Sequence, residues 1–321
     1  MNHPQAATDD RSGERVYREL MAGLQSGQKT INPKYFYDEA GSALFDQITS
    51  LPEYYPTRTE TAILKYHAEA IAMRVGRQRV VIEPGAGSCE KVRYLIPALQ
   101  PSCYVPVDIS TEYLAEAAAG LNESFPELQV EPVAADFSRT ISLPGSVDCE
   151  AGVIFYPGST IGNFEPADAV NFLQRMRSLV GSQGLVLVGV DLHKDSAVLT
   201  AAYNDTAGVT AAFNRNILLH LNRLLGADFR PDLFQHHAFY NEQKRRIEMH
   251  LVSAVRQIVN CGDVPLQFAE GETIHTENSY KYSLQDFSSL VEKAGLKLEQ
   301  SWTDRKNLFS VNLLSAAGCR R

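Results

Sequence analysis

Apolar residues along the chain fall into two alternating patterns. Short, nearly continuous apolar runs occupy residues 80–83, 104–108, 130–134, 152–155 and 185–190. The stretches beside them place apolar residues at helical spacing and predict helices over about 58–76, from about 91, and up to about 121. Apolar strands separated by helices are typical of a parallel sheet with both faces covered. The pattern therefore predicts an α/β fold.

The two ends of this region carry further signals. Residues 57–60 read Thr-Arg-Thr-Glu and predict a capping box at the start of the helix over 58–76. A helix over about 284–294 is expected to stop at Gly295, and residues 296–302 and 308–314 read as two strands joined by a turn. A parallel sheet closed by such an antiparallel hairpin is the plan of the Rossmann-like class I methyltransferases.

The rhythm of strands and helices breaks between about 193 and 283. A long helical stretch over 213–225 precedes residues 246–254, where Ile247, Met249 and Leu251 alternate as in a half-buried strand. We expect residues 58–192 and 284–321 to form the methyltransferase domain, which binds the cofactor. Residues 13–57 and 193–283 are expected to form a smaller α+β domain that binds the substrate.

Composition argues against several classes of function. The chain has 321 residues, 44% of them hydrophobic, and a net charge of −8. It has no basic run that could neutralise successive phosphates, so nucleic acid is not an expected partner. It has neither a secretion signal nor the roughly 18 consecutive apolar residues of a spanning helix, which predicts a cytoplasmic protein without a membrane partner. We expect a monomer, and the scattered cysteines and histidines indicate no metal.

The segment 80–88 is an apolar strand that ends in an acidic residue and enters a turn of small residues. Gly85 and Gly87 allow a sharp turn and a close approach of a ligand to the backbone. The third glycine of a dinucleotide-binding turn is replaced by Glu90. Because S-adenosylmethionine has no phosphates, it needs the close approach without an anion site, and it fits this turn better than a dinucleotide does.

Two later strands also lead into acidic residues. Asp108 ends the second strand, where a carboxylate can accept hydrogen bonds from both ribose hydroxyls. Asp136 and Phe137 follow the third strand, where a carboxylate can accept from the adenine amino group and a ring can cover the base. Acidic residues after three successive strands predict a site for S-adenosylmethionine.

Five longer motifs carry a family resemblance. They are Lys34-Tyr35-Phe36-Tyr37-Asp38, residues 51–60 (LPEYYPTRTE), residues 158–163 (GSTIGN), residues 207–216 (AGVTAAFNRN) and residues 246–249 (RIEM). With these motifs the chain resembles, over about residues 30–315, the histidine Nα-methyltransferases of ergothioneine biosynthesis. The resemblance implies three successive methyl transfers from S-adenosylmethionine to the α-amino group of L-histidine, which give the betaine hercynine.

The resemblance also implies which residues form the site. The cofactor would be lined by Tyr37, Gly85, Lys91, Asp108, Asp136 and Phe137. The substrate carboxylate would be held by Asn163 and Tyr203, and the amino group would face the Gly158 backbone and the Thr160 hydroxyl. The imidazole would be bound by Tyr54, Glu277 and Ser279, with Met249 as a wall of its pocket. A carboxylate beside a hydroxyl can satisfy both ring nitrogens, which an apolar pocket cannot.

This chemistry needs no catalytic base. Methyl transfer from a sulfonium is an in-line displacement, so the protein has to place a neutral amine behind the methyl carbon. A partly desolvated pocket favours the neutral amine, because burial disfavours the charged form. Gly158, Thr160 and Asn163 are therefore expected to act by positioning.

Three other functions fit parts of the sequence. An N-methyltransferase for another small amino acid, such as a tryptophan derivative, would share the fold, but Glu277 would be poorly matched to an indole. An NAD-dependent oxidoreductase is disfavoured by Glu90 and by the terminal hairpin. A regulatory module that binds S-adenosylmethionine without turnover stays open.

Overall fold

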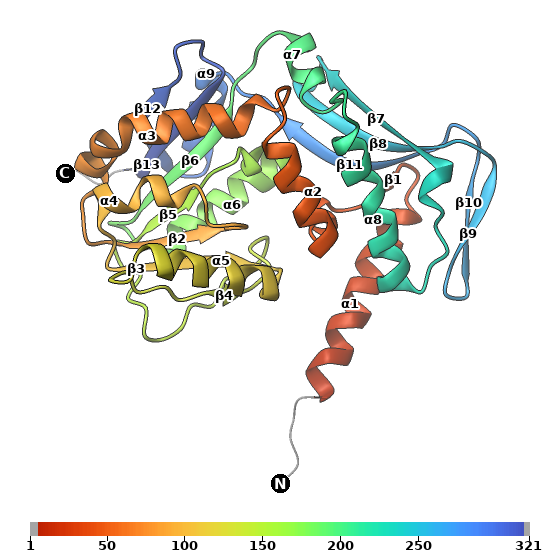
Figure 1. Cartoon of the computed structure of the whole chain (residues 1–321), viewed down its shortest axis with the longest axis horizontal. Helices are drawn as coiled ribbons and strands as arrows, with labels where there is room; N and C mark the ends of the chain where they lie inside the picture. The colour runs from red at the N-terminus through yellow and green to blue at the C-terminus, as the bar shows by residue number, and fades with distance from the viewer. Residues whose placement is uncertain (1–5, 318–321) are drawn as a thin grey trace. The chain divides into compact units, whose positions relative to one another are not determined.

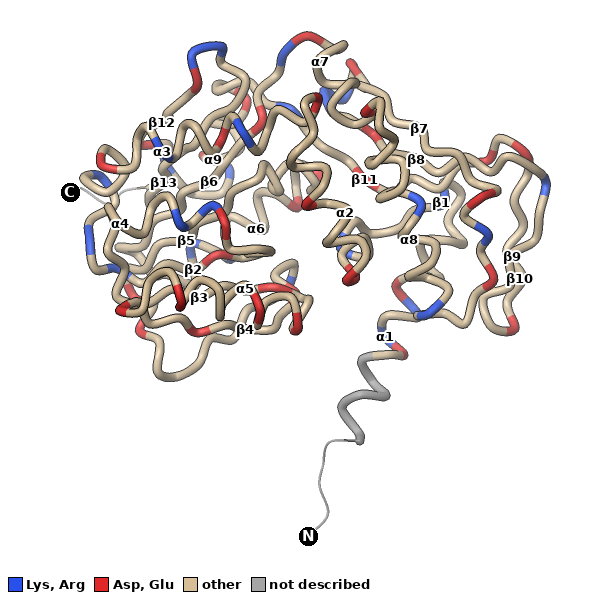
Figure 2. Tube along the Cα trace, viewed as in Figure 1, with Lys and Arg blue, Asp and Glu red and all other residues tan. Residues whose placement is uncertain are grey.

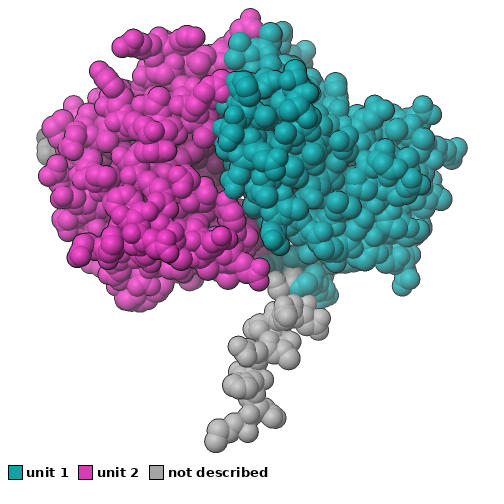
Figure 3. All heavy atoms as spheres, viewed as in Figure 1, with its two compact units in different colours: residues 1–54, 196–243, 247–278 teal, residues 55–195, 244–246, 279–321 magenta. Residues whose placement is uncertain are grey.

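The computed structural model describes residues 6–317, with side chains from residue 13 onward (Figure 1). The chain forms two compact units, which are coloured teal (unit 1) and magenta (unit 2) in Figure 3. Unit 1 comprises Met1–Tyr54, Ser196–Gln243 and Ile247–Asn278, and unit 2 comprises Tyr55–Asp195, Lys244–Arg246 and Ser279–Arg321. Each unit is therefore assembled from segments that are far apart in the sequence.

Unit 2 is built on a seven-stranded sheet with the order β12-β13-β6-β5-β2-β3-β4. The strands are β2 (Val80–Pro84), β3 (Cys103–Asp108), β4 (Val133–Ala134), β5 (Val153–Tyr156), β6 (Leu185–Asp191), β12 (Leu296–Thr303) and β13 (Phe309–Ala316). The pairs from β6 to β4 are parallel, whereas β13 is antiparallel to both β6 and β12. This sheet confirms the predicted α/β fold and its terminal antiparallel hairpin.

Helices cover both faces of this sheet. One face packs against α3 (Tyr55–Val75), η2 (Val92–Tyr94), α4 (Ile96–Leu99) and α5 (Thr111–Ser124), and the other against α6 (Pro166–Leu179) and α9 (Leu284–Lys293). Val81 and Phe155 belong to the first layer, whereas their neighbours Ile82 and Ile154 belong to the second. Successive strand residues point to opposite faces, so strands that are buried on both faces read as continuous apolar runs.

Two local predictions in unit 2 are wrong. Helix α3 begins at Tyr55, so Thr57 lies inside the helix and residues 57–60 form no capping box. Pro56 is well suited to the first turn of a helix, where its missing N–H costs nothing, and this favours the earlier start. The helix expected from Lys91 is divided into η2 and α4, and Pro97 lies in the first turn of α4.

Unit 1 contains a four-stranded sheet with the order β1-β11-β8-β7 and a separate hairpin. The sheet strands are β1 (Lys29–Thr30), β7 (Phe234–Asn241), β8 (Arg246–Ser253) and β11 (Thr273–Tyr280), and the hairpin is β9 (Gln257–Cys261) with β10 (Val264–Phe268). The helical elements are α1 (Ala6–Leu24), η1 (Pro33–Phe36), α2 (Glu39–Thr49), α7 (Ser196–Ala201), α8 (Val209–Leu225) and η4 (Pro231–Leu233).

Strand β8 is more deeply buried than its sequence indicates. Ile247, Met249 and Leu251 are buried as predicted, but Glu248 and His250 are only 7% and 8% exposed. The prediction of a half-buried strand is therefore wrong. The side of β8 that carries Glu248 and His250 is covered by protein atoms instead of solvent.

Two carboxylates, the buried Asp205 and the half-buried Asp38, fix the starts of two helices in unit 1. Asp205 accepts hydrogen bonds from the N–H groups of Val209 and Thr210, both at 2.8 Å, where α8 begins. Asp38 caps α2 by accepting from the Gly41 N–H at 2.7 Å, and it also accepts from the Asn216 amide at 2.8 Å. These bonds satisfy N–H groups that a helix start leaves without partners.

Hydropathy, charge distribution and the cysteines complete the description of the fold. Among the described residues, no helix is long and apolar enough to span a membrane. Acidic and basic residues are interspersed along the trace of both units (Figure 2). Cys89, Cys103 and Cys261 are buried free thiols and Cys149 is half-buried, while Cys319 lies outside the described residues.

Candidate functional site

The glycine turn after β2 is held by the neighbouring strand β3. The Gly85 N–H donates to the Val107 carbonyl at 2.7 Å, and the Gly87 N–H donates to the Asp108 carboxylate at 3.0 Å. Both glycines have positive φ angles, 69° and 52°, which disfavour other residues. A Cβ atom on Gly85 would lie 3.1 Å from the Phe137 ring. The structure thus brings Gly85, Asp108 and Phe137 together at the carboxyl ends of adjacent strands.

The carboxylates of Asp108 and Asp136 are fixed by hydrogen bonds from backbone N–H groups nearby. Asp108 accepts the Ser110 N–H at 3.1 Å in addition to the Gly87 N–H. Asp136 accepts the N–H of Ser138 at 3.0 Å and lies 3.5 Å from the Arg139 guanidinium. An ionised carboxylate offers about four lone-pair positions, so these bonds leave each group able to accept from a ligand as well.

The buried carboxylate of Glu60 connects two predicted site residues, and the sequence interpretation missed it. Its side chain is only 1% exposed, and its Oε2 lies 2.7 Å from Lys91 Nζ. Both of its oxygens accept the Gly158 N–H, at 2.9 and 3.0 Å. Glu60 precedes the buried Ile63 and Leu64 by three and four residues. A carboxylate on the apolar face of a helix was the signal that could have identified it.

A second buried carboxylate, Asp191 at the end of β6, gathers two lysines and a tyrosine. It is 0% exposed, accepts the Tyr55 hydroxyl at 2.7 and 2.8 Å, and lies 2.8 Å from Lys281 Nζ and beside Lys194 Nζ. Burial acts to raise the pKa of Asp191, but the two lysines outweigh it and hold the pKa below its usual value. Burial lowers the pKa of Lys194 to about 8, against the attraction of Asp191.

The Asp191 network reaches two further predicted site segments. Lys281 Nζ donates to the Ser279 hydroxyl at 2.8 Å, so it links Ser279 to Asp191. The Asp191 N–H donates to the Ser159 hydroxyl at 2.8 Å. Ser159 has a φ of 58° and Gly158 a φ of 81°, so this turn has two consecutive residues in the left-handed region. The Glu60 carboxylate on one side and the Asp191 N–H on the other hold the turn in this uncommon conformation.

Glu83, the acidic residue at the end of the first strand, is buried rather than exposed to solvent. It is 2% exposed, and its carboxyl accepts the Tyr104 hydroxyl at 2.7 Å. Burial raises the pKa of Glu83 to about 8, although the Tyr104 hydroxyl and Lys91 act in the opposite direction. Glu83 therefore holds a proton in the folded protein at a pH where an ordinary glutamate is ionised.

In unit 1, three of the predicted site tyrosines are connected through Phe45. Tyr37 and Tyr54 pack edge to face against the Phe45 ring, with centroids 5.7 and 6.3 Å away. Tyr203 packs in the same way against Tyr54 at 6.2 Å. Predicted site residues from three separate parts of the chain therefore share one aromatic cluster.

Met249 and Glu277 lie on adjacent strands of the unit 1 sheet. Met249, on β8, is 1% exposed, and its carbonyl accepts the Thr276 hydroxyl of β11 at 3.1 Å. Glu277 is half-buried on β11, two residues before Ser279 on the same strand. In unit 2, Asn163 is half-buried at the end of η3 (Thr160–Asn163), and the Thr160 hydroxyl donates to the Pro157 carbonyl at 3.0 Å.

The sheet topology, the glycine turn and the acidic strand ends together define a class I methyltransferase that uses S-adenosylmethionine. Residues 16–316 match the family model described as histidine-specific methyltransferase, SAM-dependent, and the chain belongs to this family.

Three curated relatives place the chain within the family. The histidine N-alpha-methyltransferase of Mycolicibacterium smegmatis is 38% identical, over 95% of this chain and 96% of the relative. Ergothioneine biosynthesis protein 1 of Neurospora crassa is 28% identical, over 91% of this chain and 34% of the relative. The 4-dimethylallyltryptophan N-methyltransferase of Claviceps fusiformis is 26% identical, over 89% of this chain and 88% of the relative.

Proposed function

We propose that this enzyme transfers three methyl groups from S-adenosylmethionine to the α-amino group of L-histidine. The product is hercynine, and the reaction is the first step of ergothioneine biosynthesis. The observation that carries the proposal is the match of 38% identity to a histidine N-alpha-methyltransferase, which extends over 96% of that relative. The match to an ergothioneine biosynthesis protein supports the place in the pathway.

The Gly158 turn is suited to orient a neutral amine. Glu60 already accepts the Gly158 N–H, so the Gly158 carbonyl is the group of this residue that can face an amine. The Thr160 hydroxyl donates its proton to Pro157, which leaves its oxygen as an acceptor. Two acceptors directed at the N–H groups of an amine point its lone pair elsewhere, toward the methyl donor. The turn therefore positions the nucleophile without removing a proton.

The remaining substrate contacts follow the chemistry of histidine. Glu277 and Ser279 bind the imidazole, and the bond from Lys281 fixes the Ser279 oxygen. Tyr54 and Met249 provide apolar surface for the ring, and Asn163 and Tyr203 bind the carboxylate. The edge-to-face contact between Tyr54 and Tyr203 supports a shared role for these two rings.

The cofactor contacts rest on the strand ends of unit 2. Asp108 binds the ribose hydroxyls, Asp136 accepts from the adenine amino group, and Phe137 covers the base. The close approach of Phe137 to Gly85 supports this assignment, because a side chain on Gly85 would crowd the ring. Lys91, paired with Glu60, lines the same region. Tyr37 of unit 1 is assigned to the cofactor by the family resemblance.

The test is an assay with an equimolar mixture of the twenty amino acids and S-adenosylmethionine, read by mass spectrometry over time. We expect mono-, di- and trimethylated histidine to form in succession and hercynine to accumulate. 4-Dimethylallyltryptophan is added in a parallel reaction. Methylation of that compound in preference to histidine, or binding of the cofactor without any methylation, would overturn the proposal.

We further propose that the enzyme acts in the cytoplasm as a monomer, without a nucleic-acid or membrane partner. The net charge of −8 and the absence of a basic run in the sequence support the lack of a nucleic-acid partner. Light scattering coupled to size-exclusion chromatography tests the monomer, and a mass of twice the chain mass of 35.5 kDa would contradict it.

A further inference from the structure

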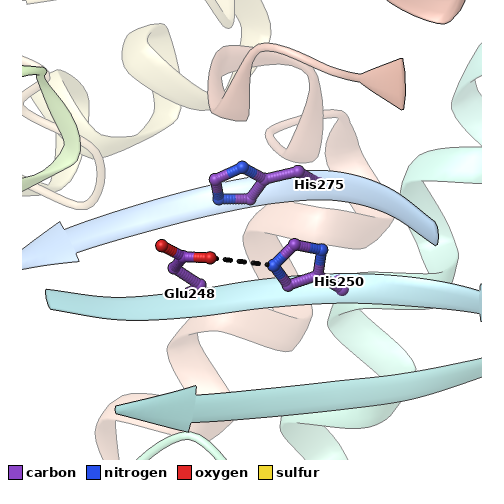
Figure 4. Close-up of side chains that lie close together, drawn as sticks. All are labelled: Glu248, His250 and His275. Carbon is purple, nitrogen blue, oxygen red and sulfur yellow. Dashed lines mark hydrogen bonds and ion pairs between the residues drawn. The ribbon is translucent and has the colours of Figure 1, made fainter. Parts of the chain in front are cut away.

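Three side chains of metal-ligand type come together on the sheet of unit 1. They are Glu248 and His250 on β8 and His275 on β11, and one potential ligand atom from each lies within 4.8 Å of the other two (Figure 4). Glu248 and His250 are buried and His275 is half-buried. None of the three was predicted as a site residue, and the proposed methyl transfer uses none of them.

The distances suit a small divalent cation. His250 Nε2 and Glu248 Oε2 are 3.2 Å apart. Two ligands at about 2.0–2.1 Å from a tetrahedral zinc ion are about 3.3–3.4 Å apart, so these two atoms already have nearly the separation that a shared ion requires. His275 stacks on His250 with ring centroids 4.5 Å apart and planes at 13°. Because parallel imidazole planes direct their lone pairs side by side, the His275 ring would have to turn out of this stack to complete a three-ligand set.

The surroundings of the cluster resemble the support that metal ligands have in proteins. The Asn241 amide donates to Glu248 Oε1 at 3.0 Å, which fixes the carboxylate and leaves Oε2 toward His250. The Phe239 ring stacks on His250 from β7, with centroids 5.6 Å apart. In the described part of the chain, His250 Nδ1 is buried without a hydrogen-bond partner. The lone pairs of the two ring nitrogens point in different directions, so the ion would bind at Nε2, the nitrogen that faces Glu248.

We propose that Glu248, His250 and His275 bind a divalent transition-metal ion of the zinc type. Two imidazoles and one carboxylate are a donor set that suits zinc and its neighbours in the first transition row, and the set leaves a position for water or another ligand. Because the ligands come from two adjacent strands, the ion would join β8 to β11. The proposal does not depend on the identity of the methyl acceptor.

The test is titration of the tag-free, chelator-treated full chain with Zn²⁺ by calorimetry and with Co²⁺ by visible absorption. We expect one ion per chain and a Co²⁺ spectrum of low coordination number. Glu248→Gln and His275→Gln should each abolish binding at concentrations that saturate the wild type. Asn241→Ala, which removes the hydrogen bond to Glu248 and leaves all three proposed ligands in place, should weaken binding by about 10- to 100-fold.

His193→Gln is the matched control, because His193 is exposed and outside the cluster. It should bind the ion as the wild type does. Circular dichroism establishes that each variant is folded, and Asn241→Ala remains informative if a ligand variant fails to fold. Wild-type stoichiometry and affinity in both Glu248→Gln and His275→Gln, or no stoichiometric binding by the wild type, would overturn the proposal.

Discussion

The two units hold their predicted site residues by different physical means. In unit 2, the glycine turn and the Gly158 turn present backbone groups, and the carboxylates of Asp108 and Glu60 fix them. The Asp191 carboxylate holds Tyr55 and two lysines beside the Gly158 turn. In unit 1, Tyr37, Tyr54 and Tyr203 present side chains that are held by ring packing. Removing one partner of a buried charge pair leaves the other charge without a counter-ion, which costs several kcal/mol of stability. Each ring contact contributes a smaller stabilising free energy of about 0.5–1.5 kcal/mol. Substitutions at the unit 2 carboxylates should therefore have the larger effects.

The largest effect on stability is expected for Asp191→Ala. Lys194 and Lys281 would lose their buried counter-ion, and breaking such a network costs about 3–5 kcal/mol. Urea unfolding followed by circular dichroism measures this change. Asp195→Ala is the control, because Asp195 is exposed four residues later and should change stability by less than about 0.5 kcal/mol. Equal effects of the two substitutions would refute the role of Asp191.

Glu60→Gln should mainly affect catalysis. The amide can still accept the Gly158 N–H, but it loses the charge that pairs with Lys91, so the turn should shift. Because displacement of a reacting group by about 1 Å can cost about 100-fold in rate, we expect a fall in kcat of about 10- to 100-fold. Steady-state kinetics with histidine test this, with the exposed Glu90→Gln as control. A normal kcat with only a raised KM for S-adenosylmethionine would assign Glu60 to the cofactor side instead.

Asp108→Ala should weaken S-adenosylmethionine binding by about 1–3 kcal/mol through the loss of charged hydrogen bonds. The loss of the bond to the Gly87 N–H contributes to this effect. Calorimetric titration with S-adenosylmethionine measures it, and histidine binding to the cofactor-loaded variant should be little changed. Unchanged cofactor affinity in the folded variant would contradict the assignment of Asp108, at the end of β3, to the ribose hydroxyls.

The burial of Glu83 predicts a dependence of stability on pH. Its pKa in the folded protein, about 8, exceeds the ordinary glutamate value of 4.5. Between these values the folded protein holds a proton that the unfolded chain has released, so the Glu83 contribution to stability falls as pH rises. Glu83→Gln should flatten this part of the stability profile, measured by urea unfolding at several pH values. An unchanged slope between pH 5 and pH 8 would show that Glu83 is ionised when folded.

The sheet of unit 2 could be predicted because its pattern is local. Each strand that is buried on both faces leaves an apolar run, and the hairpin after Gly295 consists of two strands that are consecutive in the sequence and joined by a short turn. Gly85, Asp108 and Phe137 could be placed together because parallel strands end at one edge of the sheet. These predictions succeeded because they depend only on the burial pattern of one strand or on the positions of neighbouring strands.

The carboxylate partners could not be predicted, because their bonds join distant parts of the chain. Glu60 and Gly158 are 98 residues apart, and Tyr55 and Asp191 are 136 residues apart. Read locally, Glu60 resembled a helix cap. Likewise, Glu248 and His250 read as the solvent side of β8, and only the neighbouring strands show that they are buried next to His275.

The most direct test of the proposed substrate compares initial rates of the wild type and Glu277→Ala with histidine, phenylalanine and tryptophan. Glu277 is half-buried, and a bound ring would shield it further, so a ring that offers no N–H group would leave the carboxylate unpaired and be penalised. The wild type should strongly prefer histidine. Glu277→Ala should lose about tenfold to a few hundredfold in kcat/KM for histidine and discriminate less against the other rings, with some imidazole contact retained through Ser279. A Glu277→Ala variant that keeps the wild-type preference for histidine would contradict the proposal that Glu277 binds the imidazole ring.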